Sequence, residues 1–454
     1  MQKLYPPATP PTAPAVKAIN ASRRAWLGGV SGAGLALAAG ATSTPARAER
    51  VATKAHIVIA GSGLAGLALA HRLGNDLDGA KITVIDAKEV HNYQPGYTLV
   101  ATGVWPVSKT IDSNADLMPS GVEWVKDMVA EFDPAANAVV TNSGKRISYD
   151  YLVVAVGTHQ DWGLIEGMDV KAIGQNGLAS VYPSSDAAVA TWQAMDAFRQ
   201  KGGKAVMTLP NTFLKCAGAP LKMTFMLRDR LAQAGTMGKS QIDFYSALPN
   251  IFSVKVVNDN VIERWGPLGV NLHTKQKLTA VDIGGRKATF VTPEGVSSQV
   301  DYDFIHVVPP MRAPDAVKNS DLSAKEGPQA AGSWLEVDKA TLQHRRYPNV
   351  FGLGDINGTP RGKTAATVKK SAPIVARHVV DLIAGRALSQ QFDGYTSCPM
   401  IVREGSAMLI EFDYEGKLTP SLPMIEPLQE SYFAWLMKVR MLKPAYMAVL
   451  KGRV

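Results

Sequence analysis

Short apolar runs alternate with amphipathic stretches of helical period along the chain from residue 56. The apolar runs have the length of buried strands, and they lie at the start of 56–73 and at 81–86, 149–158, 204–210 and 349–355. Amphipathic helices are predicted in the remainder of 56–73 and at 219–235 and 363–383. Strands that alternate with helices in this way predict an α/β protein built from parallel sheets.

A glycine-rich turn follows the first apolar run. HIVIAGSGLAGLALAHRL (56–73) places Gly61, Gly63 and Gly66 in a G-x-G-x-x-G pattern between a strand and a helix. The first glycine permits a tight turn, the second lets the backbone approach a pyrophosphate, and the third allows helix and strand to pack closely. KITVID (81–86) then ends in Asp86, where a carboxylate can bind ribose hydroxyls. The pattern predicts a dinucleotide site, and these four residues are its cofactor-binding candidates.

Two later strand ends favour FAD as the dinucleotide. YDYLVVAVGT (149–158) ends in a turn that contains Gly157, and NVFGLGD (349–355) ends in Gly354 and Asp355 before a predicted helix. This arrangement resembles flavoproteins of the disulfide-reductase superfamily, in which such an aspartate holds the ribityl and phosphate region of FAD. Because the fingerprint and Asp355 lie far apart in the sequence, we expect an inserted domain between two parts of the FAD-binding domain.

The inserted domain lacks a second nucleotide fingerprint. In GGKAVMTLPNTFLKCAGAP (202–220) the paired glycines precede the strand, and the turn after it holds Pro210, Lys215 and a single Gly218. Without paired glycines the backbone cannot approach a pyrophosphate closely. We therefore do not expect NAD(P)H as the electron donor, and a small nucleophile that reaches Cys216 is expected instead.

The predicted architecture is two Rossmann-like domains followed by an amphipathic membrane-associating segment. The expected divisions are a signal peptide at 1–48, the FAD-binding domain at 49–164 and 331–390, the second Rossmann-like domain at 165–330, an interface region with the second cysteine at 391–429 and the amphipathic tail at 430–454.

Charge and composition suggest an exported enzyme. The net charge is +9, but residues 1–48 hold five basic residues and no acidic one, which leaves 43 basic and 39 acidic residues in the remainder. So small an excess is not typical of a nucleic-acid-binding protein. SRRAWL (22–27) is a twin-arginine pattern, and it is followed by a short Gly/Ala-rich apolar run at 27–41 and by ARA at 46–48. These features predict twin-arginine export to the periplasmic face of the inner membrane, with an uncleaved N-terminal anchor as the alternative.

The chain has two cysteines, Cys216 and Cys398. A single structural disulfide is one interpretation for an exported protein. A reactive pair is the other, because a chain of this length has core enough without a bridge, and because Lys215, Lys222 and a predicted helix N-terminus near Cys216 favour the thiolate.

Several motifs together resemble the sulfide:quinone oxidoreductase family. They are HNYQPGYTLVATG (91–103), KCAGAP (215–220), FIHVVPPM (304–311), FGLGD (351–355) with GKTAA (362–366), and YTSCP with EFDY within 395–414. The resemblance extends from about residue 54 to the C-terminus. No third cysteine lies near the strand at 151–157, so the chain is similar to the two-cysteine, mitochondrial-like group of that family.

The resemblance implies roles for the site residues. Cys398 would accept hydrosulfide and become a persulfide, and Cys216 would be the thiolate that attacks the isoalloxazine, although the reverse assignment stays open. Lys222 and Lys363 are candidates for stabilising anionic sulfur and the anionic reduced flavin. His306 is either a core histidine or a proton carrier on the quinone side. The implied partners are hydrosulfide, a small sulfur acceptor, membrane quinone and a further copy of the chain, and no metal site is predicted.

The C-terminal tail combines apolar and basic residues. ESYFAWLMKVRMLKPAYMAVLKGRV (430–454) has aromatic residues and methionines close to helical spacing, interrupted by Pro444, and no acidic residue after Glu430. This pattern is typical of a helix that lies in a membrane interface. A core or dimer helix is the alternative, and no run is long enough to span a bilayer.

Other functions remain open on the sequence. The flavin subunit of a flavocytochrome c sulfide dehydrogenase would pass its electrons to a c-type cytochrome. An NADH:quinone oxidoreductase would need the second fingerprint that is missing here. A non-catalytic, membrane-associated flavin-fold scaffold would not need its cysteines.

Overall fold

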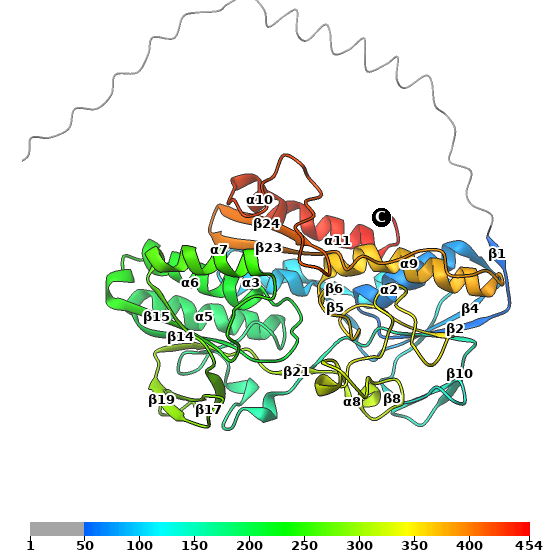
Figure 1. The fold of residues 1–454 in the computed structure, drawn as a ribbon, viewed down its shortest axis with the longest axis horizontal. Helices are drawn as coiled ribbons and strands as arrows, with labels where there is room; N and C mark the ends of the chain where they lie inside the picture. The colour runs from blue at the N-terminus through cyan, green and yellow to red at the C-terminus, as the bar shows by residue number, and fades with distance from the viewer. Residues whose placement is uncertain (1–49) are drawn as a thin grey trace, which may run out of the picture. The chain divides into compact units, whose positions relative to one another are not determined.

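Two five-stranded parallel sheets organise the computed structural model, which describes residues 50–454 (Figure 1). The predicted signal peptide at 1–48 lies outside the described residues. We call the two halves built on these sheets the first lobe and the second lobe.

The first lobe contains the glycine fingerprint. Its sheet has the strand order β22-β11-β2-β4-β7, and every pair is parallel. The strands are β2 (His56–Ala60), β4 (Lys81–Ile85), β7 (Glu123–Val125), β11 (Tyr151–Val154) and β22 (Val350–Gly352). Helices α2 (Leu64–Asp76) and α9 (Ala365–Ile383) pack against each other beside this sheet. Because the strands are parallel, the turns that follow β2, β4, β11 and β22 meet at one edge.

Smaller elements complete the first lobe. An antiparallel sheet has the order β10-β9-β8. Its strands are β8 (Val129–Asp133), β9 (Ala138–Thr141) and β10 (Arg146–Ser148). The segment between β4 and β7 carries β5 (Val90–Asn92), η1 (Gln94–Gly96), α3 (Tyr97–Val100), β6 (Ile111–Ser113) and α4 (Asn114–Leu117).

The second lobe is inserted between β11 and β22. Its parallel sheet has the order β13-β20-β14-β15-β16. The strands are β13 (Leu178–Ala179), β14 (Gly203–Leu209), β15 (Ser240–Ser246), β16 (Val270–His273) and β20 (Phe304–His306), and the helices are α5 (Ser185–Lys201), α6 (Ala219–Gln233) and α7 (Lys255–Leu268). An antiparallel sheet of β17 (Lys277–Asp282), β18 (Lys287–Val291) and β19 (Ser297–Asp301) adjoins them. After this lobe the chain returns to the first sheet as β22.

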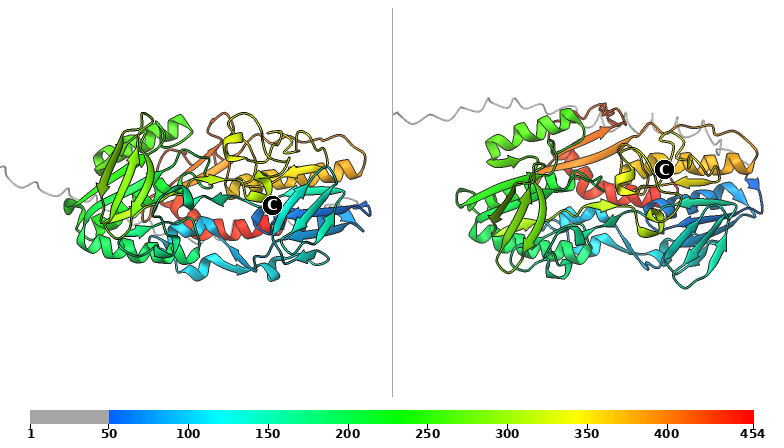
Figure 2. Two further views of the ribbon diagram at one scale, coloured as in Figure 1. Left: turned by 90° about the horizontal axis from the view of Figure 1, so that it is seen from below. Right: turned by 60° about the horizontal axis from the view of Figure 1, so that its bottom comes forward.

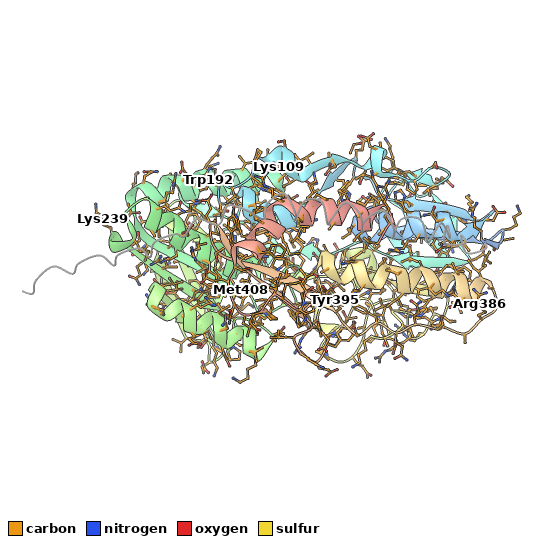
Figure 3. The ribbon with its side chains drawn as sticks, turned by 90° about the horizontal axis from the view of Figure 1, so that it is seen from above. Lys109, Trp192, Lys239, Arg386, Tyr395 and Met408 are labelled. Carbon is orange, nitrogen blue, oxygen red and sulfur yellow. The ribbon has the colours of Figure 1, made fainter. Side chains whose placement is uncertain are left out.

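The C-terminal segment connects the two lobes. Hairpin strands β23 (Thr396–Arg403) and β24 (Ser406–Phe412) pack on α6 and α9. The chain then continues through α10 (Tyr432–Leu436), a π-helical turn η7 (Met437–Met441) and α11 (Leu442–Leu450), which lies against α2 and α9. Figures 2 and 3 show this segment between the lobes, with Lys239 and Arg386 at opposite ends and Tyr395 and Met408 between them.

The predicted tail helix differs from the observed one at its centre. Pro444 has no N–H group and its ring conflicts with the carbonyl four residues earlier, which favours a wider π turn just before it. One face of the tail is part of the core, because Trp435, Tyr446 and Leu450 are buried. Tyr432, Phe433 and Met441 are more than half exposed. No helix among residues 50–454 has the length and hydropathy of a membrane span.

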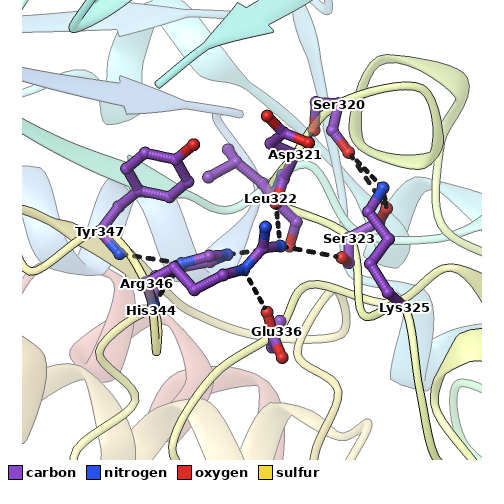
Figure 4. Close-up of polar contacts among 9 residues, drawn as sticks. All are labelled: Ser320, Asp321, Leu322, Ser323, Lys325, Glu336, His344, Arg346 and Tyr347. Carbon is purple, nitrogen blue, oxygen red and sulfur yellow. Dashed lines mark hydrogen bonds and ion pairs between the residues drawn. The ribbon is translucent and has the colours of Figure 1, made fainter. Parts of the chain in front are cut away.

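A buried histidine fixes the long loop before β22. His344 Nδ1 accepts hydrogen bonds from the backbone N–H groups of Arg346 and Tyr347, each at 3.2 Å, and Nε2 lies 3.1 Å from the carbonyl oxygen of Leu322 (Figure 4). The Arg346 guanidinium also reaches Glu336 at 2.8 Å. The neutral imidazole therefore connects three parts of the loop.

We expect this histidine to make the fold sensitive to acid. Burial lowers the pKa of His344 to about 4, while an unfolded histidine has a pKa of about 6.5. The stabilisation is complete above the unfolded value and is lost as the pH falls from about 6.5 towards 4, at a cost on the order of 3 kcal/mol. Unfolding free energies measured between pH 7 and pH 4 should therefore fall less steeply in His344→Gln than in the wild type. The exposed His159→Gln is the control, and an unchanged slope in His344→Gln would contradict this account.

Candidate active site

The predicted cofactor residues meet at the carboxyl edge of the first sheet. Gly61 follows β2, Gly63 is the N-cap of α2, and Gly66 lies in the first turn of that helix. Asp86 follows β4, Gly157 follows β11, and Gly354 with Asp355 follows β22. The parallel sheet order makes β2 the neighbour of both β4 and β11, which brings these turns together.

The backbone at this edge fits a dinucleotide. Gly61 has φ +109°, and a Cβ atom there would overlap the carbonyl oxygen of Ala155. A Cβ at Gly66 would overlap the carbonyl oxygen of Gly61, so this glycine permits the close helix packing. Gly63 faces open space and provides no side-chain cap, which leaves the first N–H groups of α2 directed at that space. These features suit the pyrophosphate of FAD, and Asp86, whose two oxygens accept from the Ser62 and Lys88 N–H groups, braces the loop.

A buried hydrogen-bond chain connects this loop to the C-terminal helix. The Tyr446 hydroxyl lies 2.8 Å from His91 Nε2, and His91 Nδ1 lies 3.0 Å from Asn114 Oδ1. The Asn114 amide then donates to Ser62 Oγ at 2.8 Å, between the first two glycines of the fingerprint. All four side chains are buried. Helix α11 therefore supports the pyrophosphate loop from behind.

We expect Tyr446→Phe to weaken FAD retention without touching the cofactor edge itself. The substitution leaves His91 Nε2 buried without its partner, a loss of about 1 kcal/mol or about fivefold in affinity. Titration of apoprotein with FAD measures the change, and thermal unfolding of the holoprotein measures it independently. Tyr432→Phe removes a hydroxyl from the exposed part of the same tail and serves as the control. Equal FAD affinities of Tyr446→Phe and wild type would refute a supporting role for the chain.

Cys216 lies in a strained turn between β14 and α6. Its φ is +50°, in the left-handed region that non-glycine residues rarely adopt. Three hydrogen bonds hold it there: its N–H donates to the Lys363 carbonyl at 2.9 Å, and its own carbonyl accepts from Ala219 N–H at 2.8 Å and from the Tyr182 hydroxyl at 3.4 Å. Strain of this kind persists only where the surroundings impose it and is typical of functional sites. The contact with Lys363 joins the turn to the cofactor edge.

Cys398 reaches the same turn from the C-terminal hairpin. It lies on β23 opposite Ile410 of β24, and it is buried. A Cβ atom at Gly218 would overlap Cys398 Sγ, so the single glycine of the turn makes room for the second sulfur. Two cysteines 182 residues apart in the sequence thus approach each other, and both are free thiols.

Lys222 lies beside both sulfur atoms. Its Nζ is 3.4 Å from Cys216 Sγ, and the side chain is 3 % exposed. Burial alone would lower the pKa of Lys222, but the charges of Cys216 and Cys398 outweigh it and raise that pKa. Burial raises the pKa of the Cys398 thiol, and Lys222 opposes the increase. The ammonium group therefore favours negative charge on the sulfur atoms.

A second buried lysine, Lys438, was missed by the sequence analysis as a site residue. It comes from η7, is 2 % exposed, and donates to the Pro95 carbonyl at 2.7 Å. Burial and the positive charge of Lys222 together lower the pKa of Lys438 to about 7, and the two cysteines oppose this decrease. The signal was available: Lys438 follows the buried Trp435 by three residues, so both lie on one helical face. The sequence analysis instead counted this lysine among the basic residues of a tail at a membrane interface.

Two other predicted lysines do not point at the sulfur atoms. Lys215 Nζ donates to Gln94 Oε1 at 2.9 Å, away from its neighbour Cys216. Lys363 Nζ donates to the carbonyls of Asp355 and Asn357 at 2.7 and 2.9 Å, and it lies 3.5 Å from the centre of the Trp334 ring. Burial lowers the pKa of Lys363 to about 7. Its side chain closes the loop after β22, while its backbone holds Cys216.

His306 lies in the core of the second lobe. It belongs to β20, is fully buried, and accepts from Val181 N–H at 3.3 Å. Burial lowers its pKa to about 3. This position favours the core interpretation of His306 over a proton-carrying one.

Known proteins resemble this chain in sequence and in fold. Residues 55–205 match the family described as pyridine nucleotide-disulphide oxidoreductase. A mitochondrial sulfide:quinone oxidoreductase of Dictyostelium discoideum is 37 % identical over 399 residues, which cover 87 % of this chain and 86 % of the relative. The Mus musculus protein of the same name is 35 % identical, over 86 % of this chain and 85 % of the relative. The crystal structure of the Aquifex aeolicus sulfide:quinone oxidoreductase superposes with a TM-score of 0.72 at 22 % identity, covering 88 % of this chain and 92 % of that one, and confirms the predicted α/β fold.

The predicted periplasmic location is wrong. The Dictyostelium and mouse relatives are mitochondrial by name, which contradicts twin-arginine export to a periplasm. The physical reason is that the two kinds of N-terminal signal share much of their composition. Both are basic, and a mitochondrial transit peptide is poor in acidic residues, as residues 1–48 are.

Proposed function

Because the chain belongs to the sulfide:quinone oxidoreductase family, we propose that it oxidises sulfide with FAD, passes the electrons to quinone, and carries the sulfur on Cys216 and Cys398. The observation that supports the cysteine assignment best is the convergence of both thiols on Lys222. The pair lies next to the loop of Lys363, which adjoins the cofactor edge.

The cysteine pair handles sulfur by nucleophilic exchange. In its oxidised form one sulfur accepts hydrosulfide and becomes a persulfide, and the other leaves as a thiolate. A nucleophilic acceptor then takes the outer sulfur of the persulfide, which leaves two reduced cysteines. FAD held at the edge formed by Gly61, Gly63, Gly66 and Asp355 would supply the two-electron acceptor that reoxidises the pair, with quinone as the final acceptor. Sulfide has then been oxidised by two electrons.

We assign different roles to the two cysteines. Cys216 is bound through its backbone to Lys363, next to the cofactor edge, so it is the thiolate on the electron-transfer side. Cys398 is deeper and lies under the influence of two buried lysines, Lys222 and Lys438. Both lysines act on both sulfur atoms, so the assignment rests on position: Cys216 takes the electron-transfer side, which leaves the more deeply buried Cys398 as the acceptor of hydrosulfide.

The exposed side of the tail is proposed to contact the membrane that holds the quinone. Tyr432, Phe433 and Met441 come from the tail, and Met424 from the loop before it, and each is more than half exposed. The tail also carries exposed basic residues and no acidic one after Glu430. Aromatic, methionine and basic side chains together suit a bilayer interface.

A mitochondrial location is proposed in place of the periplasmic one. It is supported by the names of the relatives and by the acid-free, basic composition of residues 1–48. A fusion of these residues to a fluorescent protein should enter isolated mitochondria and should fail to do so when its arginines are replaced by glutamate. Import of both fusions, or of neither, would reject this location signal.

An anaerobic titration of the purified holoprotein tests the function. Sulfide should bleach the visible absorbance of the flavin, and a short-chain quinone should restore it. NADH in place of sulfide should leave the flavin oxidised, since the turn after β14 has no pyrophosphate fingerprint. Reoxidation by cytochrome c but not by quinone would favour a flavocytochrome-type enzyme, and no response to sulfide would favour a non-catalytic scaffold.

A further inference from the structure

A cleft of about 250 Å³ opens between α6, α7 and the end of β23. Its floor includes Phe225, Leu268 and Val402. Three arginines line it as well, and they come from three different elements: Arg228 from α6, Arg264 from α7 and Arg403 from β23. The cleft thus combines an apolar floor with converging guanidinium groups.

This cleft is separate from the cysteine pair. Arg228 lies nine residues beyond Ala219, the first residue of α6 after the Cys216 turn, which corresponds to about 14 Å along the helix. Val402 lies four residues beyond Cys398, about 13 Å along β23. The buried side chain of Met400 lies on the strand between them. A ligand in the cleft therefore does not reach the sulfur atoms.

The acidic side chains of the cleft already have partners. Glu430 is bound by Arg264 at 3.0 Å, by Arg403 at 3.2 Å and by the Ser406 hydroxyl at 2.6 Å. Asp229 accepts from the Gln233 amide and from the Glu404 N–H, each at 3.0 Å. Neither carboxylate neutralises Arg228.

The side chain of Arg228 has no hydrogen bond or ion pair with another residue in the range 50–454, and its Nε is buried without a partner. A buried donor that stays unpaired is costly. An anion in the cleft would pair with the remaining N–H groups of this guanidinium, whose fork matches the oxygens of a phosphate. The unpaired atom and the cavity beside it therefore indicate an anionic ligand.

The residues next to the cleft favour a lipid headgroup as the molecule that carries this anion. Glu430, which lines the cleft, precedes the exposed Tyr432 and Phe433 of α10 by two and three residues. We propose that the cleft binds the phosphate of an anionic phospholipid headgroup, with Arg228 as its principal contact. The apolar floor then accommodates the glycerol end of the lipid. The lipid source rests on the proposed membrane contact of the tail, whereas the anion site rests on Arg228 and the cleft alone.

Vesicle flotation of the full holoprotein tests the proposal. The probes are vesicles of phosphatidylcholine alone and vesicles that also contain phosphatidylglycerol. Arg228→Gln should reduce binding to the anionic vesicles about fivefold and leave binding to neutral vesicles unchanged. Lys239→Gln, which removes one exposed positive charge at the outer end of the second lobe (Figure 3), is the matched control and should bind like the wild type. Arg403→Gln, whose side chain is largely exposed, provides a second variant if Arg228→Gln folds poorly.

Each result decides the proposal. Equal binding of wild type and Arg228→Gln to anionic vesicles overturns it, and so does an equal loss in Lys239→Gln. Stabilisation by inorganic phosphate that Arg228→Gln loses, without any preference for anionic vesicles, overturns the lipid assignment in favour of a free anion. Sulfide oxidation with a short-chain quinone is measured in parallel, so a failure of the proposed function is seen separately from a failure of the cleft.

Discussion

Cys216→Ser is expected to lower sulfide-dependent quinone reduction at least about a thousandfold, and Cys398→Ser is expected to do the same. Serine preserves the size of each side chain but cannot form a persulfide or a disulfide. Because hydrosulfide attacks one sulfur and displaces the other, removing either one stops the same exchange. The double variant should therefore be no slower than the single ones, and steady-state rates with sulfide and a short-chain quinone measure this non-additivity.

The flavin reports whether these variants fail for the expected reason. Both should retain FAD and the thermal stability of the wild type, since neither cysteine belongs to the pyrophosphate loop. Sulfide should no longer bleach the flavin anaerobically, whereas dithionite should still do so. Thr396→Ser, on the same strand as Cys398, is the control and should stay active. Activity above one per cent of the wild type in either cysteine variant would be incompatible with the proposed exchange.

Lys222→Met should cause the second largest loss, about a hundredfold in the rate at neutral pH. Lys222 Nζ is 3.4 Å from Cys216 Sγ, and it opposes the increase that burial causes in the pKa of the Cys398 thiol. Without the ammonium group that pKa rises further, and less thiolate is present at neutral pH. Activity should therefore recover partly as the pH is raised, and pH–rate profiles of wild type and variant provide the measurement.

Lys215→Met is the matched control for Lys222→Met. Both residues flank the same turn, but Lys215 donates to Gln94 instead of to a sulfur atom. The Lys215→Met variant should show the same pH dependence of sulfide oxidation as the wild type. A parallel shift in both variants would mean that net charge, and not the contact with sulfur, determines thiolate formation. An unshifted profile in Lys222→Met would remove Lys222 from the mechanism.

Patterns of residues close in sequence were sufficient to predict the cofactor-binding edge of the first sheet. The first glycine fingerprint, Asp86 and the two later strand ends were all visible because each depends on residues close in sequence and on a parallel sheet that α/β alternation predicts. The missing second fingerprint was visible for the same reason. The destination encoded by the N-terminal segment could not be predicted in this way, because a basic composition without acidic residues suits more than one transport system.

Contacts between segments that are distant in sequence could not be predicted from the sequence. Lys438 belongs to the sulfur site only because η7 packs beneath the motif at 91–103, and Tyr446 supports the pyrophosphate loop only because α11 lies on α2. Both residues were assigned to a lipid-facing tail, since helical period identifies an apolar face but not the surface that covers it. The same tail keeps Tyr432 and Phe433 exposed, so one helix combines both kinds of surface.

The sequence by itself determined the fold class, the dinucleotide edge and the presence of a cysteine in a turn without phosphate-binding glycines. Backbone chemistry decides these features, because a turn or a strand end depends on a few neighbouring residues. Only the tertiary structure decided which lysines face the sulfur atoms and how Cys398 reaches Cys216. Charge stabilisation acts over a few ångströms through a buried medium, and such proximity between residues 216, 222, 398 and 438 arises only when the C-terminal segment packs across both lobes.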